Sequence, residues 1–176
     1  MKKFELTSEF VTFLGKKFFR IKALVAFGDV KEGEFGGFVE KEENLDQSGD
    51  AWVYGNAWVS GNARVYGNAR VCGDAWVCGD AQVYGNAQVY GNARVCGDAW
   101  VQCCRDYSTA SCFGSENRTT TFFHTKDDGI CVRCGCFYGT LAEFREKVKE
   151  RHGDSRLAKE YLMLADLMEF RLSKDE

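Results

Sequence analysis

The sequence predicts a mainly β protein built around a parallel β-helix, and three observations carry this prediction. Nine consecutive six-residue units run without a gap from Gly49 to Gln102. The third and fifth residues of every unit are Ala and Val, which share one face of a strand because alternate side chains point to opposite sides. Every unit begins with Gly-Asn or Gly-Asp, residues that tolerate the backbone of a tight corner. Three units are expected to close one coil, so the repeat gives about three coils with a narrow interior of Ala and Val.

Residues 1–42 are expected to cap the N-terminal end of the coils, because an uncapped end would expose the apolar interior. Two apolar-rich runs flank Leu14-Gly15-Lys16-Lys17, which is the pattern of a β-hairpin. A weaker repeat unit, Glu43–Ser48, leads into Gly49. The β-helix is therefore predicted over residues 43–102.

The repeat breaks after Gln102, and residues 103–118 are expected to form a connector. A small ββαα domain is predicted over residues 119–176. Its two strands flank a Lys126-Asp127-Asp128-Gly129 turn. Thr140-Leu-Ala-Glu143 is a capping box that opens the first helix, which ends near His152, and the second helix runs from about Arg156 to Leu172.

Composition excludes several classes of protein. The 176 residues are 45% hydrophobic and 14% aromatic, too apolar for a disordered chain. The net charge is −3, and residues 1–48, 49–102 and 103–176 each carry one more acidic than basic group. We therefore expect no duplex nucleic acid as a partner, because no segment is basic. No apolar run approaches the roughly 20 residues of a membrane-spanning helix, so we expect no membrane association.

The pairing of an aliphatic residue with a small residue four positions later, as in Val53 and Ala57, resembles the hexapeptide-repeat family. This resemblance implies that the β-helix is left-handed and that the chain is a homotrimer packed along its flat faces. The order of the hairpin, "GGFVEKEENL", "GDAWVYGNAWVSGNA" and "CGCFYGTLAEF" is similar to a group of uncharacterised hexapeptide-repeat proteins of bacteriophages and prophages. This second resemblance implies a cytoplasmic protein of the bacterial host cell.

All nine cysteines are expected to be reduced, because no apolar signal segment directs secretion. Residues 18 apart stack in neighbouring coils, so Cys78 should lie above Cys96. The two thiols are expected to stay unpaired, because stacked neighbours are poorly oriented for a disulfide.

A second cysteine group contains Cys131, Cys134 and Cys136, and with Cys112 and His124 it offers enough ligands for zinc. It contains a single Cys-x-x-Cys pair without a matching second pair. We therefore favour structural thiols over a metal site, and we predict no metal and no cofactor.

Catalysis receives little support from the sequence. The best-known enzymes of the hexapeptide-repeat family, which the coils resemble, are acyltransferases that use a histidine at a subunit boundary as general base. This chain has only His124 and His152, both outside the coils, and His152 sits where a cationic side chain caps a helix. We predict no catalytic residue, and an acyltransferase-like enzyme using His124 is the alternative.

The outward side chains of the coils are the candidate binding surface, because they are rich in Trp, Tyr and Arg and free of acidic residues. Such a composition is typical of a subunit interface. It also suits a planar anionic ligand, since the rings can stack on a base while an Arg meets a phosphate. The candidates form three columns, Trp58 with Trp76 and Arg94, Arg64 with Trp100, and Trp52 with Arg70, together with the stacked pair Tyr66 and Tyr84.

We therefore expect a non-enzymatic binding protein, a phage- or prophage-encoded homotrimer. It would sequester a host small molecule, for instance a nucleotide immune signal, or block a host defence protein. Besides the acyltransferase, a second alternative is a rigid trimeric scaffold that presents the C-terminal domain to a protein partner.

Overall fold

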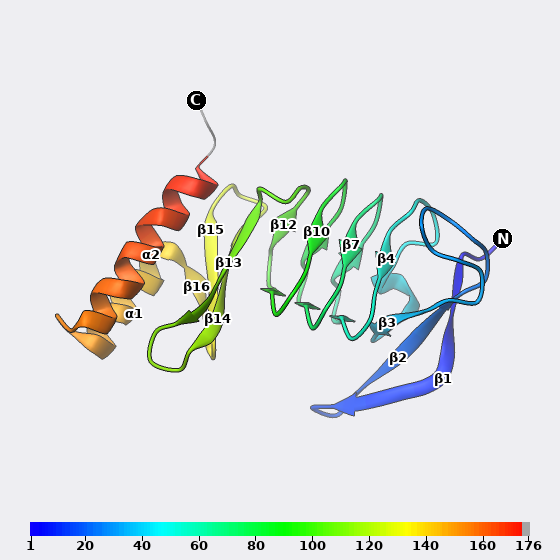
Figure 1. Cartoon of the computed structure of the whole chain (residues 1–176), viewed down its shortest axis with the longest axis horizontal. Helices are drawn as coiled ribbons and strands as arrows, with labels where there is room; N and C mark the ends of the chain where they lie inside the picture. Colours follow the sequence, from blue (N-terminus) through cyan, green and yellow to red (C-terminus); the bar gives the residue numbers. More distant parts are fainter. Residues whose placement is uncertain (174–176) are drawn as a thin grey trace. The chain divides into compact units, whose positions relative to one another are not determined.

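The computed structural model describes residues 1–173, and the chain divides into two compact units that meet between Cys104 and Arg105. The predicted fold class is confirmed, because the chain is mainly β, with a parallel β-solenoid followed by two C-terminal helices (Figure 1). The left-handed winding stays a prediction.

The coils of the first unit are built from two-residue strands at the predicted positions. The Ala and Val side chains of the repeat point inward, and each is at most 1% exposed. Strands 18 residues apart pair in parallel and in register, which gives three narrow sheets, β5-β8-β11, β4-β7-β10 and β6-β9-β12. The strands are β4 (Trp52–Val53), β5 (Trp58–Val59), β6 (Arg64–Val65), β7 (Arg70–Val71), β8 (Trp76–Val77), β9 (Gln82–Val83), β10 (Gln88–Val89), β11 (Arg94–Val95) and β12 (Trp100–Val101).

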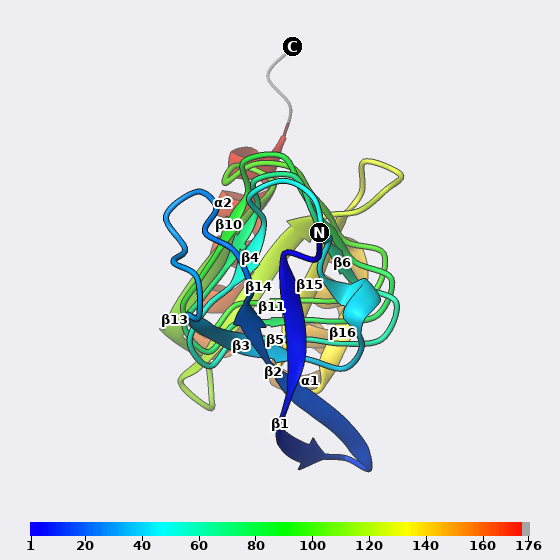
Figure 2. The ribbon, with the colours of Figure 1, turned by 90° about the vertical axis from the view of Figure 1, so that its right-hand side faces the viewer.

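The N-terminal segment forms the expected cap and extends one sheet of the solenoid. Strands β1 (Phe4–Phe13) and β2 (Lys16–Ala23) pair as an antiparallel hairpin, which projects beyond the outline of the coils (Figures 1 and 2). Strand β3 (Phe35–Val39) then pairs with β2 on one side and with β5 on the other. A short 3-10 helix, η1 (Glu42–Asn44), precedes a bridge between Leu45 and Val65. The segment before Gly49 therefore begins an additional, partial coil.

Lys3 closes the open end of the first coil. Its side chain is only 4% exposed, and its ammonium group donates hydrogen bonds to the carbonyl oxygens of Ser48, Gly49 and Ala51 at 2.9–3.3 Å. Burial lowers the pKa of Lys3 from its usual 10.5 to about 8, although the nearby carboxylates Asp46 and Asp50 oppose the shift. The cap thus contains a buried cation that is held by backbone oxygens.

Lys3→Met is expected to change how stability depends on pH. Between about pH 8 and pH 10.5 the unfolded chain still holds the proton that folded Lys3 has lost, so wild-type stability rises with pH in this window. One proton contributes at most about 1.4 kcal/mol per pH unit. Urea unfolding should show that the free energy of unfolding of the wild type is higher at pH 9 than at pH 8. In Lys3→Met the free energy of unfolding should not rise between these two pH values.

The control for this experiment is Lys2→Met, because the Lys2 side chain is 62% exposed and its ammonium group pairs with Glu42 at 2.9 Å. In Lys2→Met the free energy of unfolding should rise from pH 8 to pH 9 as it does in the wild type. The same rise in Lys3→Met would show that another group causes it.

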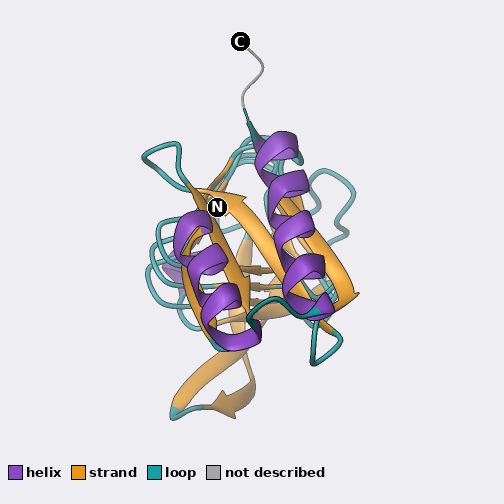
Figure 3. Cartoon of the chain, turned by 90° about the vertical axis from the view of Figure 1, so that its left-hand side faces the viewer, coloured by secondary structure: helices purple, strands orange, loops and turns teal. Residues whose placement is uncertain are grey.

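The second unit contains a four-stranded antiparallel sheet with two helices side by side against it (Figure 3). The prediction that residues 103–118 form a connector is wrong, because residues 107–113 form strand β13, which pairs with β14. Ala110 of this strand lies in the apolar core of the unit. The strands are β13 (Tyr107–Phe113), β14 (Arg118–His124), β15 (Ile130–Cys134) and β16 (Phe137–Thr140).

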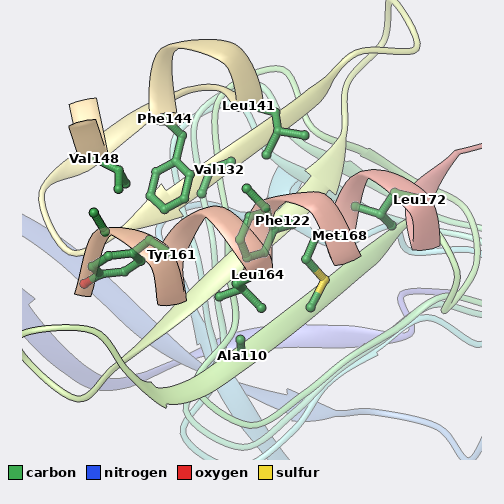
Figure 4. Close-up of a cluster of buried hydrophobic side chains, with 12 residues drawn as sticks. Ala110, Phe122, Val132, Leu141, Phe144, Val148, Tyr161, Leu164, Met168 and Leu172 are labelled. Atoms are coloured by element: carbon green, nitrogen blue, oxygen red, sulfur yellow. The ribbon is translucent and has the colours of Figure 1, made fainter. Parts of the chain in front are cut away.

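Both helices have the predicted boundaries. Helix α1 (Leu141–His152) begins at a capping box in which the Thr140 hydroxyl accepts a hydrogen bond from the backbone of Glu143, whose carboxylate accepts one from the Thr140 backbone. Helix α2 (Arg156–Leu172) is capped by Ser155. The two helices and the sheet enclose the apolar core drawn in Figure 4. No helix within residues 1–173 is both long enough and apolar enough to cross a membrane.

The expectation of nine reduced thiols is wrong for one pair. A disulfide joins Cys78 to Cys96 across neighbouring coils, with the Cα atoms 4.6 Å apart. This spacing lies inside the range that a disulfide spans, so in-register stacking brings the two cysteines close enough to bond. The other seven cysteines are not joined in disulfides within residues 1–173.

Denaturing alkylation without reductant is expected to label seven of the nine cysteines. After reduction the count should rise to nine. Peptide mapping should place the two protected residues at Cys78 and Cys96, with Cys72 labelled as an internal control from the same coils. Nine labels before reduction would show that the pair is not bonded.

Candidate functional site: an aromatic groove on the coils

The structure brings the candidate residues together in the predicted columns. Trp58 lies beside Trp76, and Trp76 lies beside Arg94, as parallel neighbours on β5, β8 and β11. The indole rings of Trp58 and Trp76 meet edge to face with centroids 6.1 Å apart. The Arg94 guanidinium lies 5.9 Å above the Trp76 ring, within reach of a cation–π interaction.

The hairpin turns this column into a groove. Phe13, at the end of β1, places its ring 5.6 Å from both Trp58 and Trp76, in edge-to-face contact with each. Phe38 of β3 lies 6.0 Å from Trp58 at the opposite end of the column from Arg94. The result is a groove of about 540 Å³, lined by Val11, Phe13, Phe38, Asn56, Trp58, Asp74, Trp76 and Arg94.

Hydrogen bonds and neighbouring rings fix the walls of the groove. The Trp76 indole N–H donates to the Ser60 hydroxyl at 3.0 Å, which sets the orientation of the ring. Phe18 of β2 packs on Trp58 with ring centroids 4.6 Å apart. The aromatic surface is therefore in place before any ligand arrives, which lowers the entropy cost of binding.

The groove has one cation and one anion at its rim. Arg94 is exposed on β11, while Asp74 lies at a corner, where its carboxylate accepts a long hydrogen bond of 3.5 Å from Asn56. A planar ligand between the rings could direct an anionic group to Arg94 and an N–H or O–H group to Asp74. The described lining residues include no histidine, cysteine or serine that could act as nucleophile or general base.

The second column forms a separate aromatic cluster. Tyr66 and Tyr84 stack with their rings 5.1 Å apart and nearly parallel, and the Trp100 indole N–H donates to the Tyr84 hydroxyl. The Arg64 guanidinium lies 5.9 Å from the Tyr66 ring. Burial raises the pKa of Tyr66, and the neighbouring Tyr84 adds to the shift. This cluster is a second polar and aromatic face of the same coils.

In the third column, the prediction that Trp52 belongs to an outward binding surface is wrong. Trp52 is fully buried under Phe4 and Phe27, whose rings lie 6.1 and 5.3 Å away. Arg70 pairs with Asp29 at 2.9 Å. The segment between β2 and β3 therefore covers this face, and Trp52 anchors it there.

Asp29 also organises the surroundings of Arg70. It accepts a hydrogen bond from the Tyr54 hydroxyl at 2.9 Å. Burial, helped by this hydrogen bond, raises the pKa of Tyr54 to about 12. Burial raises the pKa of the neighbouring Cys72 thiol, although Arg70 opposes the shift. Cys72 is thus held as a thiol near neutral pH and is a poor nucleophile.

The remaining candidates lie in the C-terminal unit. His124, at the end of β14, has a buried Nδ1 for which residues 1–173 supply no hydrogen-bond partner. Cys131 and Cys134 are three residues apart on β15 and point to opposite faces. Among residues 1–173 no three His, Cys, Asp or Glu side chains group as metal ligands would.

The sequence pattern missed the contribution of the hairpin to the groove. Phe13 and Phe38 are not part of the repeat, and their contacts with Trp58 depend on how the hairpin folds back. Phe13 remains 41% exposed although it ends a strand of the cap, and this exposure marks it as part of a surface site.

A family model described as the YdcK Beta solenoid repeat matches residues 63–79 and 87–102. Both segments lie in the coils, so the match supports a β-solenoid repeat in this part of the chain. No curated protein matches the chain.

Proposed function

We propose that this chain is a non-enzymatic binding protein that holds a small planar anion, such as a nucleotide, in the groove of Trp58, Trp76 and Arg94. The observation that carries the proposal is the preformed aromatic column with a guanidinium at one end. Stacking of a base on aromatic rings contributes about 1–3 kcal/mol. A bidentate arginine adds a charge-assisted contact to a phosphate or carboxylate.

Binding without catalysis fits the chemistry of the groove. Its lining contains one carboxylate, Asp74, and no histidine, cysteine or serine. The coils leave the site rigid, with interior side chains that are at most 1% exposed. A rigid site with one carboxylate and no histidine, cysteine or serine suits a protein that withholds its ligand from other proteins.

The proposal includes the cellular setting that the phage-like sequence pattern implies. In the cytoplasm of a bacterial host, such a protein would sequester a nucleotide signal of the host's defence, or block a defence protein. We further propose that it acts as a homotrimer. The face of Arg64, Tyr66, Tyr84 and Trp100 supports this, because interface cores favour Tyr, Trp and Arg.

Calorimetry against adenine mononucleotides and cyclic nucleotides tests the proposal. At least one of them should release or absorb heat with a one-to-one stoichiometry per chain. Adenosine serves as the control, because it keeps the base and lacks the anion. No heat from any nucleotide would overturn the nucleotide part of the proposal.

A scaffold that presents the C-terminal unit to a protein partner is the second candidate function. Three apolar side chains of α2 are exposed on one side of the helix, Met163, Leu167 and Phe170, at 71%, 57% and 81%. Such a row suits a helix that docks in a groove. A photo-crosslinking residue at 167 should capture a specific protein in the host, whereas the same residue at Lys149 should not.

A further inference from the structure

The C-terminal unit contains a cavity that the proposed function does not use. It measures about 270 Å³ and lies beside Phe144 and Tyr161, which Figure 4 shows together with Val148 at one end of the core. This volume is that of about nine water molecules at ~30 Å³ each, so it admits an organic molecule of about ten non-hydrogen atoms. The apolar wall consists of Phe113, Phe137, Phe144, Val148 and Tyr161.

Ring contacts hold the wall of the cavity in place. Phe144 contacts Phe137 at 5.5 Å and Tyr161 at 5.8 Å between ring centroids, the second pair nearly perpendicular. His152, which also lines the cavity, stacks on Tyr161 with ring centroids 5.6 Å apart. The aromatic surface is thus preformed and requires no rearrangement to accept an apolar body.

Gly114 shapes the turn that borders the cavity. Its φ is +71°, and a Cβ atom at this position would lie 1.7 Å from the Tyr161 hydroxyl oxygen. No side chain fits there unless the tyrosine ring moves. The turn therefore lies close over Tyr161 and keeps the ring against the wall.

The rim of the cavity is basic. Helix α1 presents Lys147 and Arg151 on the same side as Phe144 and Val148, because residues three and four apart share a helix face. Strand β14 adds Arg118, so three permanent cations face one carboxylate, Glu116. Residues 103–176 as a whole carry 12 basic and 13 acidic groups, so the positive rim is a local arrangement.

The existing ion pairs leave these cations available to an anion. Arg118 and Glu116 approach to 3.6 Å, with both side chains 60% exposed. Lys147 pairs with Glu150 at 2.7 Å, and both side chains are again largely exposed. Exposed pairs of this kind are weak, so an anion bound at the rim can replace them.

We propose that this cavity binds a small organic anion of about ten non-hydrogen atoms in all, a carboxylate or phosphomonoester on an apolar body. The apolar body lies against Phe144 and Tyr161, and the anionic group meets Arg151 and Lys147 at the rim. This site is separate in sequence from the groove on the coils and is independent of the function proposed for that groove.

Titration of the full-length protein with phenyl phosphate, benzoate and phenol tests the inference. Phenyl phosphate or benzoate should bind, and whichever binds more tightly identifies the preferred anionic group. Phenol should bind at least about tenfold more weakly, because it lacks the charge. The proposal would be overturned if phenol bound as tightly as the better of the two anions, or if neither phenyl phosphate nor benzoate bound.

Two matched variants locate the bound anion. Arg151→Gln should weaken phenyl phosphate binding by about tenfold. Lys149→Gln removes one charge from the same helix at a position outside the cavity, and it should leave binding unchanged. Both side chains are exposed, so both variants should fold. An equal loss in the two variants, or a loss caused by Arg94→Gln on the coils, would show that the anion binds elsewhere.

Discussion

Gly79→Ala is expected to lower the free energy of unfolding by about 3 kcal/mol, and Gly91→Ala by about 1 kcal/mol. The two glycines have φ values of +72° and +66°, so both substitutions impose a similar backbone strain. They differ in what the new methyl group meets. At Gly79 it would lie 2.7 Å from the backbone nitrogen of Gly97 in the next coil, whereas at Gly91 nothing lies within 4 Å. The difference between the variants therefore measures how closely the corners stack.

The free energies of unfolding of both variants and the wild type are compared by urea unfolding, with circular dichroism as the signal. Gly91→Ala is the matched control for backbone strain. Equal losses would mean that the corners do not stack as closely as the structure indicates. A larger loss in Gly91→Ala would contradict the arrangement of the last coil.

Arg94→Gln is expected to weaken nucleotide binding by about 10- to 100-fold, because the variant loses a charged contact worth about 1.5–3 kcal/mol. The side chain is exposed on β11, so the fold should survive the change. Trp76→Ala should have an effect of the same order, since it removes the ring on which the base stacks. Calorimetry with the nucleotide that binds the wild type most tightly gives both values.

Arg64→Gln is the control for this experiment. It removes the same charge from β6, where the arginine lies against Tyr66 on another face of the coils. Binding per chain should stay within about twofold of the wild type, because Arg64 is not among the residues that line the groove. Equal losses in Arg64→Gln and Arg94→Gln would indicate a general charge effect and would count against the groove as the site.

The repeat could be predicted because its information is local. Each corner requires a Gly followed by Asn or Asp, and each strand requires small residues at alternate positions, so the sequence alone determines which residues stack. The pairings of Trp58 with Trp76 and of Trp76 with Arg94 follow from this period. The same holds for helix α1, whose first turn is set by the side chains of Thr140 and Glu143.

Contacts between segments outside the repeat could not be predicted in this way. Trp52 has the same sequence environment as Trp58, yet it is buried because Phe4 and Phe27 cover it from the cap. The strand at residues 107–113 has no strong alternation of its own and gains its position from pairing with β14. The basic cavity combines residues from six elements and the turns between them, which no single motif indicates.

Native mass spectrometry of the protein purified directly from cells tests the central claim most directly. The groove of Trp58, Trp76 and Arg94 should retain a small molecule, so the wild-type assembly should carry an additional mass that is lost in Arg94→Gln and kept in Arg64→Gln. The number of chains in the assembly, which we expect to be three, is read from the same spectrum. Bare protein in all three preparations, or the same additional mass in all three, would contradict the claim that this groove is the binding site.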